Sequence, residues 1–400
     1  MTYDFNKVIN RFNTNSVKWD NTEKLFGDEE ILPMWIADMD FTAPPLVIDA
    51  ISKRAKHGVY GYTTRTPHYF QTFIDWMNRR HNWSIEKRWI RCTPGIMPAL
   101  SIAIQAFTNK NDKIIIQTPV YTPFTEVVQK NDREIVLNPL ILEENRYEMD
   151  FKNLEEVVQK PDVKMIILCN PHNPAGRVWS EEELTRLGQI CIENGVLIVS
   201  DEAHFDIVYK GFTHTPFASI SQEFADNSIT CTAPSKTFNL AGVQMANIII
   251  PNKELRDSFT KIIDTLYLGL SNTFGVTASE AAYQYGEEWL DQFLDYMEGN
   301  LIFLTEFLET NLKEIKVIPP EGTYLAWLDC RALGMESKEL EQFFHEKAKV
   351  AFDEGYTFGL GGEGFTRVNM ACPRSVLEEG LRRVEKAVKK HLIRDGEGVV

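Results

Sequence analysis

The sequence predicts an α/β protein, with a mostly parallel sheet in a large domain and a smaller α+β domain after it. Three observations support this. Short apolar runs alternate with helix-like segments up to about residue 285, the pattern changes after that point, and 400 residues is long for a single hydrophobic core. We therefore expect an N-terminal arm over residues 1–45, a large domain over 46–285 and a small domain over 286–400.

The strands of the large domain are predicted by five nearly continuous apolar runs, a pattern typical of strands covered on both faces. In chain order they span residues 113–118, 163–170, 195–202, 228–232 and 246–250. Between them lies the helix-like segment SEEELTRLGQICIEN, in which Ser180 followed by Glu183 predicts a capping box. Strand–helix–strand repetition favours parallel pairing, and functional sites in such sheets lie in the loops where strands end.

The small domain is expected to begin with a long helix over residues 287–313. The segments KVIPPEGTYLAWLD and GFTRVNMACP follow it and resemble strands. The N-terminal arm resembles neither domain, and we expect it to pack against the small one.

Composition limits the class of protein. A net charge of −15 argues against general binding to nucleic acid or to an anionic membrane. The six cysteines are scattered without a CxxC pair, and several lie in apolar runs, which indicates buried reduced thiols. The N-terminal residues contain no continuous apolar segment typical of a secretion signal, and no run approaches the length of a membrane span. We therefore expect a cytoplasmic protein.

Lys236 lies in the segment CTAPSKTFNLAG, among small, hydroxyl-bearing and apolar residues. One interpretation is a structural lysine at a strand end. The other is a catalytic lysine whose amine attacks a carbonyl group, which requires a lowered pKa. The type and position of this lysine do not distinguish the structural interpretation from the catalytic one, so the other motifs of the sequence are needed.

Two further motifs follow predicted strands. In SDEAH, Asp201 ends a strand, where a buried carboxylate needs a cation, and His204 lies three residues later. The pair could form a salt bridge, but no Cys or His cluster supports a metal site, so we expect none. In NPHNPAGRV, the prolines make a rigid turn from which Asn173 can point into a cleft.

Anion- and ring-binding groups are predicted in three other places. Gly95, Ile96 and Met97 open an apolar helix and present free N–H groups suited to a phosphate. Tyr121, in TPVYTPF, can stack on a planar ligand. Arg367 lies inside a predicted strand of the small domain, where a buried guanidinium needs a carboxylate from the protein or a ligand. Each feature alone has an ordinary structural explanation, but together they fit pyridoxal phosphate holding an amino acid.

The order of motifs YGYTTRTP, GIMPAL, VYTPF, NPHNPAG, SDEAH, SKTFNLAG and FTRVNMACPR resembles fold-type I pyridoxal-phosphate enzymes of the aminotransferase class I/II group. The resemblance covers nearly the whole chain, from Trp35 to Arg374. PMWIADMDF and SKTFNLAG are most similar to bacterial cystathionine β-lyases and related carbon–sulfur lyases. The family resemblance implies that the large domain has the fold of aspartate aminotransferase and that the protein is a homodimer.

The resemblance also implies roles for individual residues. Lys236, Tyr121 and Asp201 would be catalytic, with Lys236 holding the cofactor and Asp201 facing its ring nitrogen. The expected cofactor-binding set is Gly95, Ile96, Met97, Tyr121, Asn173, Asp201, His204, Thr232, Ser235, Lys236 and, from the neighbouring subunit, Tyr60 (or Tyr62). The expected substrate-binding set is Ala37, Arg367, Tyr121 and Asn173.

Two positions depart from the wider group. His204 stands where many aminotransferases carry Tyr, and the lyases are similar to this sequence at that position. Gln244 stands where many relatives place a phosphate-binding Arg. The resemblance implies β-elimination from cysteine S-conjugates, with L-cystathionine as one substrate. An aminotransferase is the alternative, and a regulatory binding protein on the same scaffold is a third reading.

Overall fold

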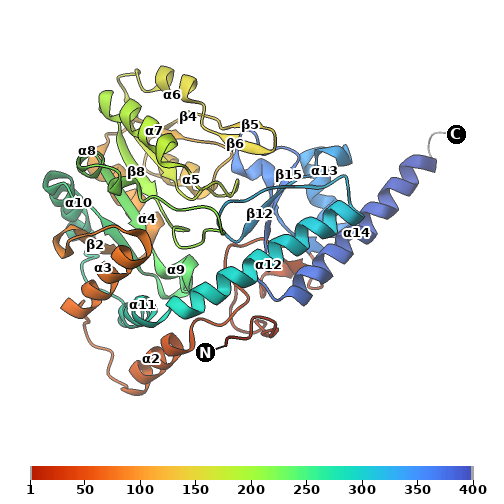
Figure 1. Ribbon diagram of the computed structural model, residues 1–400, viewed down its shortest axis with the longest axis horizontal. Helices are drawn as coiled ribbons and strands as arrows, with labels where there is room; N and C mark the ends of the chain where they lie inside the picture. The colour runs from red at the N-terminus through yellow and green to blue at the C-terminus, as the bar shows by residue number, and fades with distance from the viewer. Residues whose placement is uncertain (1, 398–400) are drawn as a thin grey trace.

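A computed structural model describes residues 2–397, and its centre is a seven-stranded sheet (Figure 1). In sheet order the strands are β2 (Ile90–Thr93), β10 (Ala246–Ile249), β9 (Ser228–Thr232), β8 (Leu197–Asp201), β7 (Val163–Cys169), β3 (Lys113–Ile116) and β4 (Glu134–Leu137). β10 runs antiparallel to both of its neighbours, β2 and β9, and every other neighbouring pair in this sheet is parallel. The prediction of a mostly parallel sheet is confirmed, as are its five strands. The edge strands β2 and β4 were not predicted, because Arg91 interrupts the first and the second has only three consecutive apolar residues after Glu134.

Helices cover both faces of this sheet, because alternate residues of each strand point to opposite sides. Ile114 and Ile116 pack on one face and Ile115 on the other. The first face carries α4 (Ile96–Phe107), α5 (Pro123–Lys130) and α10 (Lys253–Thr265), and the second carries α6 (Phe151–Val157), α7 (Glu181–Glu193) and α8 (Gln222–Asp226). The predicted capping box begins α7, with Ser180 and Glu183 each accepting a backbone hydrogen bond from the other.

A second, antiparallel sheet lies towards the C-terminus, as expected. Its strands in order are β11 (Lys316–Ile318), β12 (Leu325–Asp329), β15 (Phe365–Asn369) and β14 (Asp353–Glu354). The long helices α12 (Glu287–Asn311) and α14 (Arg374–Glu397) lie side by side in both views and share an apolar core with this sheet and with α13 (Ser337–Gln342). A short hairpin of β5 (Ile141–Glu143) and β6 (Arg146–Glu148) lies beside it.

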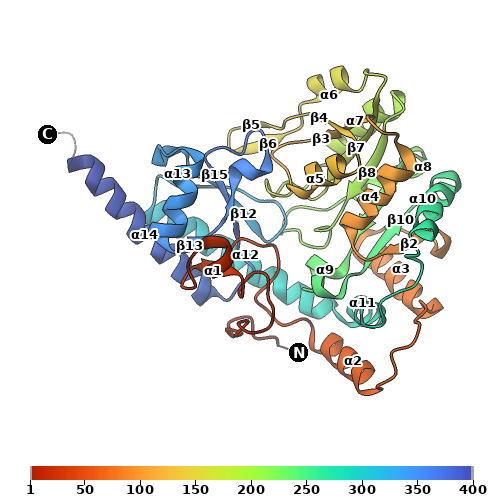
Figure 2. The same ribbon diagram turned by 180° about the vertical axis from the view of Figure 1, so that it is seen from behind.

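The N-terminal segment contacts both parts of the chain. After α1 (Thr22–Phe26), the short strand β1 (Leu32–Pro33) pairs with β13 (Val350–Ala351) next to the smaller sheet (Figure 2). Phe5 and Met39, however, belong to a core shared with three helices of the larger part. These helices are α2 (Pro45–Lys56), α3 (Pro67–His81) and α11 (Thr273–Tyr285). The division into arm, large and small domains stays our proposal.

All six cysteines are buried and free, as the sequence indicated. Within residues 2–397, no helix is both long and apolar enough to cross a membrane.

Candidate active site

A cavity of about 150 Å³ lies where β7 and β8 end, and it collects most of the predicted site residues. Those that line it are Ala37, Ile96, Met97, Tyr121, Asn173, Asp201, His204, Ser235 and Lys236. The parallel strands β7 and β8 deliver Asn173 and Asp201 to the same edge of the sheet, since both residues lie at or just after the strand ends. The segment after β9 brings Lys236 to that edge.

Lys236 lies in the four-residue helix α9 (Pro234–Thr237) and lines the cavity. The amine donates a 2.6 Å hydrogen bond to the carbonyl oxygen of Ala37, and no carboxylate pairs with it among the described residues. Burial, with the positive charge of Arg367, lowers the pKa of Lys236 to about 8. The neutral, nucleophilic amine is therefore far more accessible near pH 7 than in an ordinary lysine.

Asp201 ends β8, and its carboxylate has only one hydrogen-bond donor among the described residues, the backbone N–H of Ala203 at 3.0 Å. Burial raises the pKa of Asp201 to about 7, because one hydrogen bond does not offset the loss of water around the charged carboxylate. His204 does not supply the missing cation through an ion pair. Burial and the nearby Lys236 charge lower the pKa of His204, which leaves the imidazole neutral.

Pyridoxal phosphate fits these unsatisfied groups. The carboxylate of Asp201 can accept from a protonated ring nitrogen, and Nδ1 of His204 is buried without a hydrogen-bond partner. Tyr121 lines the cavity two residues before α5, and its N–H donates to the carbonyl oxygen of Asn173 at 3.0 Å. No group of His, Cys, Asp and Glu in residues 2–397 could hold a metal ion.

The predicted anion site lies at the start of α4, where Gly95 precedes the first helical residue. The N–H groups of Ile96 and Met97 have no acceptor within the helix because they lie in its first turn. Of the two hydroxyls expected here, that of Ser235 faces the cavity. The hydroxyl of Thr232 instead donates to the carbonyl oxygen of Asn247 at 2.9 Å. Gln244 is exposed and does not line the cavity.

Arg367 is buried in β15, and the structure supplies a protein carboxylate for it. Its guanidinium donates to Asn173 Oδ1 and to the carbonyl oxygen of Trp35, both at 3.0 Å, and pairs closely with Asp353. Its Nε is buried with no partner. Asp353 was not predicted, because only the pairing of β14 with β15 places it opposite Arg367.

The loop of residues 36–41 forms one wall of the cavity and is held from several directions. The carbonyl oxygen of Ala37 accepts from Lys236 and, at 2.8 Å, from the hydroxyl of Tyr324. The side chain of Asn369 donates to two carbonyls of this loop, and that of Asn239 donates to two more. Sequence reasoning missed these residues, since nothing in their local pattern indicates a distant backbone partner.

The same loop carries two aspartates that bind the N-terminal segment. Arg11 makes a two-point contact with Asp38 at 2.8 and 2.7 Å and reaches Asp40 at 2.7 Å. Lys18, almost completely buried, donates to Asp40 at 2.7 Å. These ion pairs fix the cavity wall to residues more than 20 positions away in the chain.

Tyr60 does not reach this cavity. Its side chain is exposed, and its hydroxyl donates to the carbonyl oxygen of Ala55. Tyr62 is almost fully exposed. Val59 on the same loop is also exposed, as is Leu270, which precedes Ser271, the partner of Thr63 in a β-bridge.

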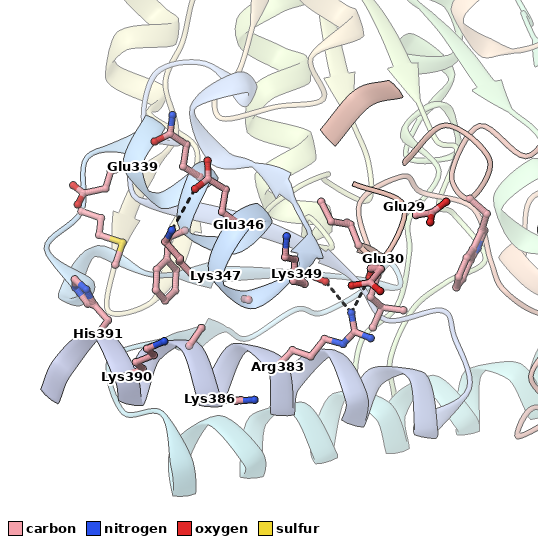
Figure 3. A pocket seen from close by; sticks show the side chains of 18 of the residues that line it. Glu29, Glu30, Glu339, Glu346, Lys347, Lys349, Arg383, Lys386, Lys390 and His391 are labelled. Atoms are coloured by element: carbon pink, nitrogen blue, oxygen red, sulfur yellow. Dashed lines mark hydrogen bonds and ion pairs between the residues drawn. The ribbon is translucent and has the colours of Figure 1, made fainter. Parts of the chain in front are cut away.

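A larger cavity, of about 1100 Å³, lies between the N-terminal segment, α13 and α14 (Figure 3). Lysines and glutamates line it together, and Lys347 pairs with Glu346 within it. It collects none of the predicted site residues.

Comparison with known proteins agrees with the geometry. The sequence model described as aminotransferase class I and II matches residues 30–384. The chain is 47% identical to cystathionine β-lyase PatB of Bacillus subtilis, over 96% of this chain and 100% of that protein.

Two solved structures are similar over nearly the whole chain. One, a pyridoxal-phosphate-bound protein from Clostridium difficile 630 described as an aminotransferase, is 46% identical with a TM-score of 0.95, covering 97% of this chain and 100% of that one. The other, a pyridoxal-phosphate-bound C–S lyase from Staphylococcus hominis, is 36% identical with a TM-score of 0.91, covering 97% and 98%.

Proposed function

The chain belongs to the aminotransferase class I and II family, and on this premise we propose that it is a carbon–sulfur β-lyase dependent on pyridoxal 5'-phosphate. It cleaves L-cystathionine or another cysteine S-conjugate by β-elimination, and with one water the products are a thiol, pyruvate and ammonia. The similarity to cystathionine β-lyase PatB and to the C–S lyase structure supports this choice of reaction.

One observation carries the proposal: a lysine amine with a lowered pKa and a carboxylate with a raised pKa face the same small cavity. Such opposed shifts are rarely retained for stability alone, because both groups are poorly compensated for their burial. Bound pyridoxal phosphate supplies an electron sink that acidifies the Cα–H bond of a substrate amino acid. Asp201 holds the proton on the ring nitrogen that this sink requires.

The other residues of the cavity bind and orient. The N–H groups of Ile96 and Met97, with the Ser235 hydroxyl, would hold the phosphate. Tyr121, which lines the cavity, would stack on the ring. Arg367 presents its unpartnered Nε to the substrate carboxylate.

Lys236 moves the proton. Its amine, whose pKa burial lowers in the cofactor-free chain, would accept the Cα proton of the substrate and then donate a proton to the departing sulfur. Ala37 orients this amine through the 2.6 Å hydrogen bond from Nζ. A good leaving group on Cβ therefore leads to elimination.

The test is a panel of S-substituted cysteines, including L-cystathionine, scored by pyruvate and free thiol. We expect both products in equal amounts, and none from a Lys236→Ala variant. Release of neither product across the panel, together with efficient amino-group transfer to 2-oxo acids, would favour the aminotransferase instead. That second function is favoured by the similar structure described as an aminotransferase.

We also propose a homodimer. The exposed apolar side chains of Val59, Tyr60 and Leu270 offer a surface for a second chain, from which Tyr60 would reach the neighbouring cofactor. Sedimentation of the holoenzyme tests this, and a fully active monomer would contradict it.

The six free cysteines support our proposal of a cytoplasmic location.

A further inference from the structure

A buried carboxylate outside the cavity connects the helix of Lys236 to the loop of Asp201. The side chain of Asp206 is fully buried and accepts three hydrogen bonds. Its Oδ2 accepts from the hydroxyl of Thr237 at 2.7 Å. Its Oδ1 contacts Nε1 of Trp76 at 3.0 Å and Nε2 of His81 at 2.8 Å.

The carboxylate of Asp206 lies close in the chain to residues that line the cavity, and its hydrogen-bond partner is next to Lys236. Asp206 lies two residues after His204 and five after Asp201, on the loop that borders the cavity. Thr237 is the residue directly after Lys236. One hydrogen bond therefore joins the two segments that carry the opposed amine and carboxylate.

The helix of Lys236 depends on such an anchor. Four residues form little more than one helical turn, and so short a helix has no stability of its own. The hydrogen bond of Lys236 to Ala37 involves the reacting amine itself, so it is not an anchor independent of the reaction. The Thr237–Asp206 bond does not involve the reacting amine and can persist.

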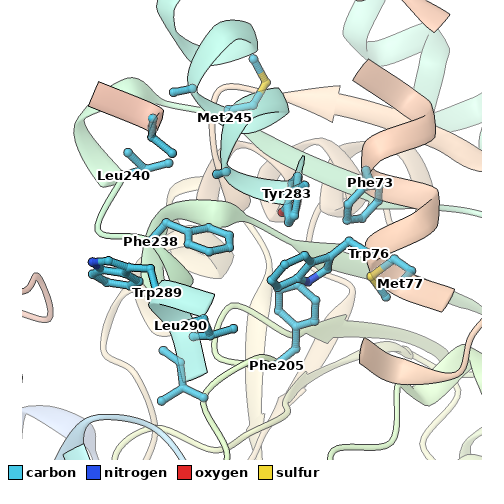
Figure 4. Close-up of a cluster of buried hydrophobic side chains, with 14 of the residues drawn as sticks. Phe73, Trp76, Met77, Phe205, Phe238, Leu240, Met245, Tyr283, Trp289 and Leu290 are labelled. Atoms are coloured by element: carbon cyan, nitrogen blue, oxygen red, sulfur yellow. The ribbon is translucent and has the colours of Figure 1, made fainter. Parts of the chain in front are cut away.

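The far side of the anchor is rigid. His81, at the end of α3, stacks on Phe205 with ring centroids 4.7 Å apart. Trp76 belongs with Phe205 and Phe238 to one buried apolar cluster (Figure 4). Two side chains fixed by packing thus hold Asp206 in place, and Asp206 in turn holds Thr237.

We propose that Asp206 is a positioning residue that sets where the amine of Lys236 sits relative to the charges around it. Arg367, Asp38 and Asp201 act electrostatically on that amine, so a displacement of α9 changes both its proton affinity and its reach. This inference rests on the proposed function, since it concerns the same lysine.

The test uses Thr237→Val, which removes the donor and keeps the shape, with Thr237→Ser as the conservative variant. The matched control is Tyr147→Phe, which deletes another buried hydrogen bond, from Trp327 Nε1 at 3.1 Å, in a different core cluster. For each holoenzyme we would measure the pH midpoint of the cofactor's visible absorbance, kcat, and thermal unfolding.

We expect Thr237→Val to move the pH midpoint and to lower kcat by about 10- to 100-fold, the effect of a misplaced reacting group. Thr237→Ser should restore both, and Tyr147→Phe should lose only stability. If Thr237→Val matches Tyr147→Phe, with an unchanged midpoint and kcat, the role is structural and the proposal is overturned. If Thr237→Val does not fold, Thr237→Ala removes the same bond and is judged by the same criteria.

Failure of the proposed function would look different. In that case the wild-type protein would release no pyruvate from any S-conjugate, while the absorbance midpoint would still report on the position of Lys236.

Discussion

Replacing Asp201 with Asn should stabilise the cofactor-free protein, although it removes a residue that we place in the catalytic centre. Asn has the same shape as Asp and keeps an oxygen for the N–H of Ala203. What it removes is a buried negative charge. In cofactor-free protein that charge has no adequate partner, so its loss should be favourable.

The magnitude follows from the pKa of Asp201, which is raised from 3.8 to about 7 by burial. Between these two pH values the folded chain binds more protons than the unfolded one, so the wild-type stability falls as pH rises. The fall is complete above about pH 7 and amounts to about 4 kcal/mol at most. Asn does not titrate, so the variant lacks this loss.

Urea unfolding of cofactor-free wild type and Asp201→Asn at pH 5 and pH 8 measures the difference. We expect the variant's advantage to grow from pH 5 to pH 8, and cofactor retention to be weaker than in wild type. Asp206→Asn is the matched control: its NH2 group would replace one of two carboxylate oxygens that both accept hydrogen bonds, so stability should drop at both pH values. An Asp201→Asn variant with no pH-dependent advantage would refute the reasoning.

Three other substitutions probe the surroundings of the cavity. Lys18→Met leaves the buried Asp40 short of one cation, and urea unfolding should show a loss of about 3 kcal/mol. Arg367→Lys loses the planar guanidinium, so steady-state kinetics should show KM for an S-conjugate raised by about tenfold or more, with a smaller change in kcat. Gly176→Ala would place a Cβ 2.5 Å from that of Pro320 at a φ of +69°, so thermal unfolding should show a loss of about 2 kcal/mol. Unchanged values would contradict each of these in turn.

The sequence was informative where local chemistry and strand ends coincide. Asp201 ends an apolar strand, and Asn173 and Lys236 follow two others. Parallel pairing brings such positions together without any knowledge of long-range register. The capping box of α7 is likewise local, since both of its partners lie within one turn.

Contacts between segments distant in the chain could not be predicted from local sequence patterns. Asp353 meets Arg367 only because β14 and β15 pair in one register, and no period in either segment specifies that register. The ion pair of Lys18 with Asp40 spans a loop whose path depends on the finished core. The antiparallel direction of β10 was also hidden, because a buried strand reads the same in either direction.

The identity of the lysine that carries the cofactor tests the account most directly. Reduction of the holoenzyme with borohydride fixes the cofactor to its lysine, and mass spectrometry of the digested protein locates the added mass. We predict that this mass lies on the peptide containing Lys236 and on no other. Its presence on a different lysine, with Lys236 unmodified, would contradict the account.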